Sequence, residues 1–197
     1  MERQNGPWII KSTESRYKDA FMELQVDQVI KPNKEEGTYA TLQMKSGVTI
    51  LATNSKGQVY LTKQFRYAIG EESIELIAGG IDKGEEPLVA AKREAKEELG
   101  IEADEWTQMG VMHLETSIVK GPVYLFTAHH LHCTDTDPDD TEDITGFKVS
   151  LQEAVEMVMH NKITHGPSCV LILKAAHPNP PEGRASPSHS PEGQTVL

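Results

Sequence analysis

The spacing of apolar residues predicts that the first part of the chain is built mainly of strands. Met22, Leu24 and Val26 alternate with polar residues, and residues 38–44 do so in part. Alternation with a period of two is typical of half-buried β-strands. A further short apolar segment, residues 73–78, ends at two consecutive glycines.

Two apolar runs in the middle of the chain predict a β-hairpin. Residues 48–52 and 58–62 flank the sequence Asn-Ser-Lys-Gly at residues 54–57, which is rich in turn-forming residues. Residues 106–114 and 123–131 predict two more strands, and the segment between them is expected to be a loop.

The segment at residues 87–99 has the termination signals of a helix. Pro87 suits the first helical position, and Gly100 suits the left-handed conformation that ends a helix.

Two more helices are predicted near the C-terminal end. Ser150 and Glu153 match a capping box ahead of a helix at residues 151–161, and an apolar helix is expected to begin near Ser168. Together with the strands, these segments indicate an α+β fold in which helices pack on strands.

Length and composition indicate one globular domain with a polar tail. The 197 residues can bury a sizeable core. Residues 177–197 contain five of the eleven prolines, and we expect this tail to be disordered because it has little apolar surface to bury. Cys133 and Cys169 are expected to be buried, reduced thiols.

Charge and hydropathy exclude several kinds of partner. A net charge of −11 disfavours nucleic-acid binding, which requires clustered Lys and Arg. No apolar run approaches the length of about 20 residues that spans a bilayer, and no secretory signal is recognisable. The sequence therefore predicts a cytoplasmic protein that binds neither nucleic acid nor membrane.

Acidic residues gather on the helix predicted at residues 87–99. Glu94, Glu97 and Glu98 are spaced i, i+3 and i+4, which places their carboxylates on one face. A solvated acidic face is the simplest interpretation. A packed helix is favoured instead, because the same segment has an apolar face, formed by Ala91, Ala95 and Leu99.

Such a cluster suits a hard divalent cation. Mg²⁺ commonly takes one or two carboxylates together with water and substrate phosphates. The glycines after Ala78 allow the main chain to come close and to add a carbonyl oxygen. Glu85 precedes the helix and is expected to pair with Arg93, which would hold the loop against the helix.

These residues resemble the Nudix box. Gly79 is followed after five residues by Glu85, and after seven more by the run Arg-Glu-Ala-Lys-Glu-Glu-Leu-Gly-Ile at residues 93–101. Every fixed position matches, although Ala95 is smaller than the usual residue at its position. The sequence preceding the box, including Gln-Phe-Arg at residues 64–66, looks like that of pyrophosphatases acting on ADP-ribose and nucleoside-diphosphate sugars.

The resemblance implies roles for particular residues. It makes Glu94 and Glu98 the main Mg²⁺ ligands, with Glu97 assisting and the carbonyl of Ala78 completing the shell; Mn²⁺ is expected to substitute for Mg²⁺. The resemblance also implies that Arg93, Glu85 and Glu97 are catalytic residues.

Outside the box, the resemblance assigns Arg66 and Glu75 to substrate binding. Lys120, in the loop where the chain departs from the family pattern, is a further candidate for contact with a phosphate or the distal sugar. For Arg66 the alternative is a surface arginine beside a strand end, and for Lys120 it is an exposed loop lysine. The resemblance also places the general base at Glu142 in the acidic loop 135–143, where the alternative is a solvated loop.

The expected fold is the Nudix α/β/α sandwich, a mixed sheet between helices with an N-terminal antiparallel strand element. We divide the chain into an N-terminal element at residues 1–53 that forms a homodimer, a hydrolase domain at residues 54–176, and the tail 177–197. In similar proteins both subunits shape the substrate pocket.

The expected reaction is Mg²⁺-dependent hydrolysis of the pyrophosphate bond of a nucleoside diphosphate derivative, ADP-ribose or another nucleotide sugar, to two phosphate monoesters. The loop 115–122 lacks the Ser-Pro-Gly stretch typical of ADP-ribose hydrolases, so the sugar stays open. The alternatives are a nucleoside triphosphate pyrophosphohydrolase that removes unwanted nucleotides and a non-catalytic nucleotide sensor. Against the sensor, all three box glutamates are present.

Overall fold

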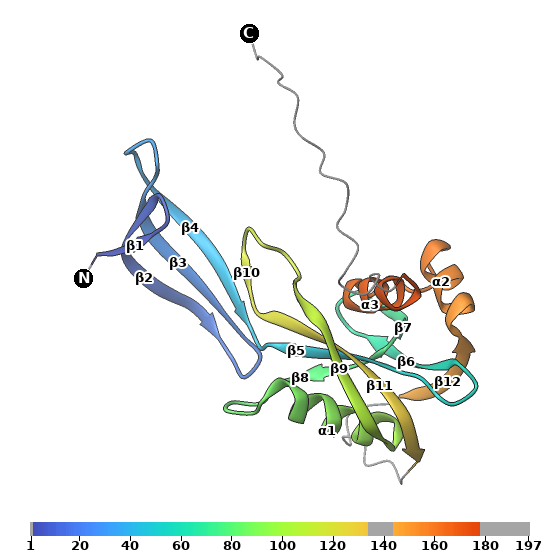
Figure 1. The fold of residues 1–197 in the computed structure, drawn as a ribbon. Coiled ribbons are helices and arrows are strands. Elements are labelled where there is room, and N and C mark those ends of the chain that lie inside the picture. The colour runs from blue at the N-terminus through green and yellow to red at the C-terminus, as the bar shows by residue number, and fades with distance from the viewer. Residues whose placement is uncertain (1, 134–143, 178–197) are drawn as a thin grey trace, which may run out of the picture.

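The computed structural model describes residues 2–133 and 144–177. These ranges form three β-sheets and three helices (Figure 1). The acidic loop predicted at residues 135–143, and the predicted tail apart from His177, lie outside the described residues.

The N-terminal sheet has the strand order β1-β2-β3-β4-β10. Its strands are β1 (Arg3–Asn5), β2 (Trp8–Lys18), β3 (Met22–Ile30), β4 (Glu36–Met44) and β10 (Val119–Lys120). The first four are antiparallel, whereas β10 pairs with β4 in parallel register. The segment between residues 114 and 123, predicted as a loop, therefore adds a short strand to this sheet.

The second sheet has the order β8-β5-β11-β9 and forms the centre of the fold. It consists of β5 (Gly47–Ala52), β8 (Ile77–Gly80), β9 (Ile101–His113) and β11 (Pro122–Cys133). The third sheet, β12-β6-β7, contains β6 (Gln58–Arg66), β7 (Glu71–Glu75) and β12 (Thr145–Ser150).

The predicted hairpin of residues 48–52 and 58–62 is wrong. The turn between the strands exists, because Asn54 N donates to Gln58 O at 3.0 Å. Beyond it only Thr53 and Val59 pair. β5 uses both edges to pair with β8 and β11, and β6 uses both to pair with β7 and β12.

The apolar segment predicted at residues 73–78 is likewise divided between two sheets. β7 ends at Glu75 and β8 begins at Ile77, and the fully buried Leu76 lies between them. The division carries the chain from the third sheet to the central sheet just before the glycines of the box.

Helices cover both faces of the central sheet, as Figure 1 shows. α1 (Pro87–Leu99) packs on one face, while α3 (Gly166–Ala176) packs on the other and contacts α2 (Leu151–Met159). Alternate residues of β5 face the two sides: Ile50 joins the core under α1, and Leu51 joins the core under α3. The predicted α/β/α arrangement is confirmed.

The helix boundaries differ slightly from those expected. α1 spans the predicted residues, and Gly100 is left-handed with φ 59°. α2 ends at Met159, before Asn161, whose φ of 56° cannot continue a helix. Its Ser150 cap is confirmed, with Glu153 N donating to Ser150 Oγ at 3.1 Å. α3 begins earlier than Ser168, at Gly166.

Two absences apply to the described ranges. Cys133 and Cys169 are free thiols there, but Cys133 is exposed and Cys169 is half-buried, so the predicted burial is wrong for Cys133. No helix in residues 2–133 or 144–177 is long and apolar enough to cross a membrane.

Candidate active site

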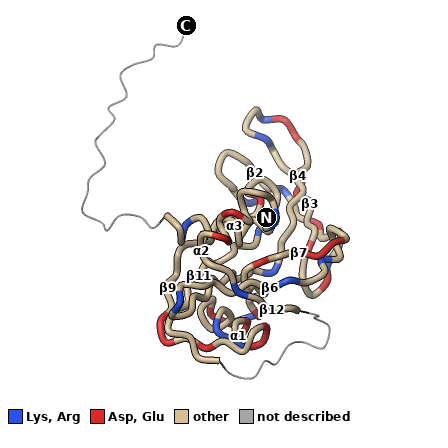
Figure 2. The backbone as a smooth tube through the Cα atoms, turned by 90° about the vertical axis from the view of Figure 1, so that its right-hand side faces the viewer, with Lys and Arg blue, Asp and Glu red and all other residues tan. Residues whose placement is uncertain are grey.

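Arg93, near the middle of α1, organises the acidic residues around it. Its Nη1 donates to Glu94 Oε1 and Glu97 Oε2, both at 2.8 Å. Its Nη2 donates to the carbonyl oxygen of Gly80 at 2.9 Å. Figure 2 shows acidic and basic positions lying next to one another around α1. This guanidinium offsets the repulsion that closely spaced glutamates would otherwise cause.

The loop before α1 is held by the same guanidinium, as predicted. Arg93 Nε donates to Glu85 Oε1 at 3.0 Å and Nη2 donates to Glu85 Oε2 at 3.1 Å. Glu85 also accepts from Asp82 N at 2.9 Å. The hydrogen bonds from Arg93 are the main reason that the pKa of Glu85 lies below its ordinary value. The carboxylate therefore stays ionised at neutral pH.

Glu94 lies directly over Gly79. A Cβ atom at Gly79 would be 1.9 Å from Glu94 Cδ, closer than any two such atoms approach. Glycine at this position is thus what lets the carboxylate lie against the strand β8. The sequence indicated close approach of the main chain here, and the structure identifies Glu94 as the group that approaches it.

The three glutamates of α1 differ in their exposure. Glu98 is buried, with 6% of its surface exposed. The side chain of Glu94 is 13% exposed and that of Glu97 is 38% exposed. A buried acidic residue is costly unless its charge is compensated. This difference does not fit a plain solvated face.

A cavity of about 420 Å³ opens beside these residues. Its lining includes Arg66, the Ala78–Gly80 backbone, Lys45 and His165. Lys45 Nζ binds Asp82 Oδ1 at 2.8 Å and lies against Gly80. The lining therefore combines the main chain of the box glycines with the cationic side chains of Lys45 and Arg66.

Arg66 and Glu75 form a paired unit at this cavity. Arg66 Nε donates to Glu75 Oε1 at 2.8 Å and Nη2 donates to Oε2 at 2.6 Å. Two parallel hydrogen bonds fix the plane of a guanidinium. The side chain of Glu75 is only 4% exposed, whereas that of Arg66 is 38% exposed. Glu75 supports Arg66 from behind, and Arg66 is the member that faces the cavity.

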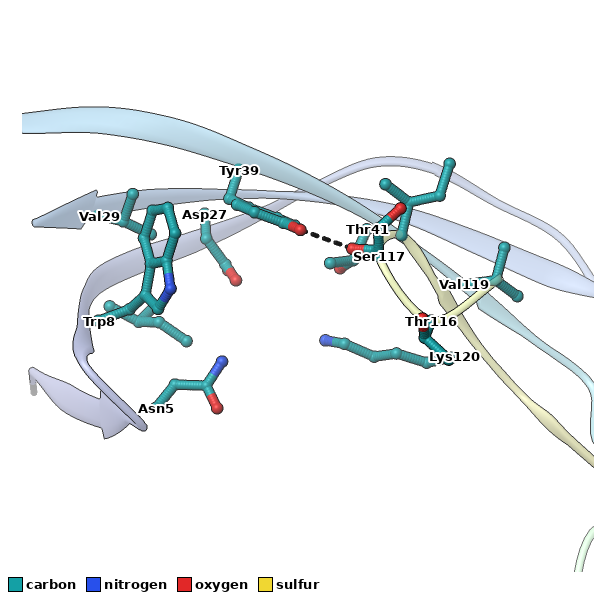
Figure 3. A pocket seen from close by; sticks show the side chains of 12 residues that line it. Asn5, Trp8, Asp27, Val29, Tyr39, Thr41, Thr116, Ser117, Val119 and Lys120 are labelled. Atoms are coloured by element: carbon teal, nitrogen blue, oxygen red, sulfur yellow. Dashed lines mark hydrogen bonds between the residues drawn. The ribbon is translucent and has the colours of Figure 1, made fainter. Parts of the chain in front are cut away.

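Lys120 lies elsewhere. It is on β10 and lines a second cavity of about 270 Å³ in the N-terminal sheet, extending across it from the side opposite Trp8 and Asn5 (Figure 3). Trp8 meets Tyr39 edge-to-face, with ring centroids 5.4 Å apart, and the Tyr39 hydroxyl donates to Ser117 O at 2.6 Å. The two cavities share no lining residue. Glu142 lies outside the described residues.

The cavity thus brings the glycine backbone of the motif at residues 79–101 together with Arg66. Comparison with known proteins identifies the family to which this motif belongs. The model of the NUDIX domain matches residues 44–169. The chain belongs to the Nudix family. It is a Nudix hydrolase, and residues 79–101 are its Nudix box.

Named relatives extend the match. This Nudix chain is 26% identical over 152 residues to an ADP-ribose pyrophosphatase of Bacillus subtilis, covering 76% of this chain and 82% of that protein. It is 29% identical over 143 residues to a GDP-mannose pyrophosphatase of Escherichia coli, covering 67% and 75%. It is 23% identical over 164 residues to a methanol dehydrogenase activator of Bacillus methanolicus, covering 81% and 88%.

A solved structure supports the fold. A crystal structure of an ADP compounds hydrolase superposes with a TM-score of 0.75 at 15% identity, covering 85% of this chain and 91% of that one.

The donor set of the Nudix box suits a divalent cation of the Mg²⁺ type. All the candidate metal ligands are oxygen atoms. The carboxylates around Arg93 outnumber this one guanidinium. In residues 2–133 and 144–177 no three His, Cys, Asp or Glu side chains converge as a ready-made metal site, and Arg93 holds both Glu94 and Glu97. Mg²⁺ needs only one or two carboxylates when water and phosphate supply the rest.

Sequence reasoning missed His165. Its Nδ1 lies 2.8 Å from Ser168 Oγ and 3.6 Å from Glu75 Oε2. The pairing with Glu75 spans ninety residues of sequence, and no local motif signals it.

Proposed function

We propose that this Nudix hydrolase cleaves the pyrophosphate bond of a nucleoside diphosphate derivative, ADP-ribose or another nucleotide sugar, into two phosphate monoesters. The observation that carries the proposal is the cavity between the box and the Arg66–Glu75 pair. Its lining includes the Arg66 guanidinium and the Gly79 backbone, against which the Glu94 carboxylate lies, an arrangement suited to a diphosphate bridged by metal ions. Two of the relatives are named for nucleotide-sugar substrates, ADP-ribose and GDP-mannose.

Each residue of the site has a proposed task. Glu94 and Glu98 hold the metal, Glu97 assists, and Ala78 adds its carbonyl oxygen. Bound Mg²⁺ supplies charge neutralisation for the diphosphate and lowers the pKa of a coordinated water. Arg93 and Glu85 hold the loop and the helix together, so that the carboxylates keep their places. Arg66, supported by Glu75, binds a phosphate oxygen by charge-assisted hydrogen bonds.

The water that attacks phosphorus must lose a proton to a base. Glu142 remains our proposed base, on the strength of the family resemblance. In this proposal Glu142→Gln lowers kcat far more than it changes KM, because the side chain acts on the proton and not on substrate binding. An unchanged kcat would show that another group takes the proton.

We test the substrate class with a panel of ADP-ribose, other nucleotide sugars, dinucleoside polyphosphates and nucleoside triphosphates, each with Mg²⁺ or Mn²⁺. We expect the diphosphate sugars to give the highest kcat/KM and two phosphate monoesters as products. Turnover of nucleoside triphosphates alone would overturn this proposal and would show a nucleoside triphosphate pyrophosphohydrolase instead. Folded protein that hydrolyses nothing would favour the sensor function.

The metal role of Glu98 is tested by Glu98→Gln, which keeps the shape of the side chain and removes its charge. We expect a loss of activity of about a hundredfold or more. Direct Mn²⁺ binding, measured by electron paramagnetic resonance, should weaken in parallel. Full activity with unchanged Mn²⁺ binding would exclude Glu98 as a ligand. Lys96→Gln on the same helix is the control, because Lys96 pairs with the exposed Glu102.

We also propose a homodimer in which Lys120 contacts the substrate held by the second copy. Within one chain, Lys120 lines the cavity of the N-terminal sheet and does not line the catalytic cavity. A second copy is therefore the simplest way to bring Lys120 to a substrate. Size-exclusion chromatography with light scattering should give twice the chain mass of 21.8 kDa. A monomer would overturn the proposal.

Mixing two variants tests directly whether Lys120 of one copy acts on the substrate bound by the other copy. Glu98→Gln lacks the metal ligand, and Lys120→Ala is expected to bind substrate weakly. When the two are unfolded together and refolded, a mixed dimer has one site with both defects and one with neither, if Lys120 acts across the interface. Activity should then exceed the sum of the two variants refolded separately. Strict additivity would place Lys120 and its site in the same copy.

A further inference from the structure

Three polar side chains from distant parts of the sequence meet at the wall of the catalytic cavity. Arg66 is the last residue of β6, Glu75 is the last residue of β7, and His165 is the residue that precedes α3. Arg66 and His165 both approach the same oxygen of Glu75. Arg66 Nη2 lies 2.6 Å from Oε2, and His165 Nδ1 lies 3.6 Å from it.

The Glu75 carboxylate is held as an anion in this buried place. Burial by itself would raise its pKa, but the hydrogen bond and the charge of Arg66 outweigh that effect, together with a hydrogen bond from Ser73 and, when the ring is protonated, the charge of His165. The net pKa lies below the ordinary value. If this carboxylate turned about its last bond, the Arg66 guanidinium that it holds would turn with it.

His165 lies beside one oxygen of this carboxylate, with Nδ1 3.6 Å from Glu75 Oε2. Its ring is anchored, because Nδ1 lies 2.8 Å from Ser168 Oγ, and that hydroxyl accepts from Leu76 N at 2.9 Å. Ser168 is fully buried. The start of α3 is thereby tied to the residue that follows Glu75. Burial is the largest influence on the pKa of His165 and lowers it, so the ring is neutral at neutral pH.

We propose that His165 is a positioning residue for Arg66: it confines the Glu75 carboxylate, so that the Arg66 guanidinium faces the phosphates of the substrate in one orientation. The proposal rests on the function proposed above, in which Arg66 binds a phosphate. His165 acts through Glu75, and its effect should therefore disappear when Arg66 is removed.

Two substitutions separate this role from support of the helix. His165→Ala removes the ring. His165→Asn also removes it, but asparagine at the residue before a helix satisfies a backbone N–H and keeps α3 stable. We expect both variants to raise KM by about threefold to tenfold with kcat changed less, since coupled neighbours commonly interact at this level. The melting temperature of His165→Asn should stay near that of the wild type.

The decisive measurement is a double-mutant cycle with Arg66→Ala. If His165 acts through Arg66, the substitution His165→Asn has no further effect on KM in the Arg66→Ala background. Equal effects in both backgrounds would overturn the proposal, as would a wild-type KM in both His165 variants. His160→Ala is the matched control, because His160 is an exposed histidine that follows α2 and bonds Glu156 O.

A binding measurement keeps this test separate from the test of the proposed function. Calorimetry with inorganic pyrophosphate and Mg²⁺ reports the same cycle without turnover. Inactive protein that still shows the coupled loss of pyrophosphate affinity would refute the proposed reaction and support the role of His165. Protein that binds no pyrophosphate and hydrolyses no diphosphate would overturn both.

Discussion

At the scale of single residues, the absence of a side chain at Gly79 decides where the Glu94 carboxylate lies. The clash that a Cβ would cause is with the far end of a flexible side chain. Such a clash is relieved by moving the carboxylate, at small cost to folding. We therefore expect that a side chain added at Gly79 changes activity strongly and the stability of the fold little.

Gly79→Ala should therefore separate the two properties. We expect activity to fall by about a hundredfold, because displacing a reacting group by 1 Å can have this effect, while the melting temperature changes little. Gly166→Ala is the control, since a Cβ there meets nothing within 4 Å. A fully active Gly79→Ala protein would show that the position of Glu94 does not matter.

At the scale of elements, the loop before α1 is attached to the helix through one side chain. Arg93 bonds Glu85, Glu94, Glu97 and the Gly80 carbonyl, and its side chain is 30% exposed. Lysine cannot reproduce these contacts, because it lacks the planar arrangement of five N–H donors.

Arg93→Lys should lower the free energy of unfolding by about 1–3 kcal/mol, as expected when several charge-assisted hydrogen bonds are lost. Denaturant titration measures this change. The comparison is Lys96→Ala on the same helix, whose exposed pair with Glu102 should contribute less than about 1 kcal/mol. Equal effects of the two substitutions would mean that Arg93 is an ordinary surface charge.

Local patterns predicted α1 and the cap of α2 because the signals lie within a few residues of each other. They did not predict the partners of β5 and β6, which depend on which strand edges are already occupied. The turn at residues 54–57 was recognised, yet the chain after it enters another sheet. Turn chemistry determines a reversal of the chain and not the pairing beyond it.

At the scale of the whole molecule, paired carboxylates make stability depend on pH. The pKa values of Glu75 and Glu85 both lie below their ordinary values in the folded state. A carboxylate of this kind stabilises the fold above its unfolded pKa of about 4.3, and this contribution is lost as the pH falls through the folded pKa.

The buried His165, whose pKa lies below its ordinary value, should make the unfolding free energy decline below about pH 6.5. The paired carboxylates should add a further fall below about pH 4.3. Urea titrations between pH 5 and 3 measure the slope. Glu75→Gln should lower stability at pH 7 and make this slope smaller. A slope that Glu75→Gln does not alter would contradict the pairing with Arg66.

The sequence by itself determined the family, the Nudix box and the helix that carries it, because these depend on fixed spacings along a single segment. It also indicated the pairing of Glu85 with Arg93, which lie eight residues apart. Only the tertiary structure decided what surrounds that segment. The placing of Glu94 over Gly79, the support of Arg66 by Glu75 and His165, and the separation of Lys120 from the catalytic cavity depend on contacts between residues far apart in the chain. Such contacts form where sheets and helices meet, and no local pattern records them.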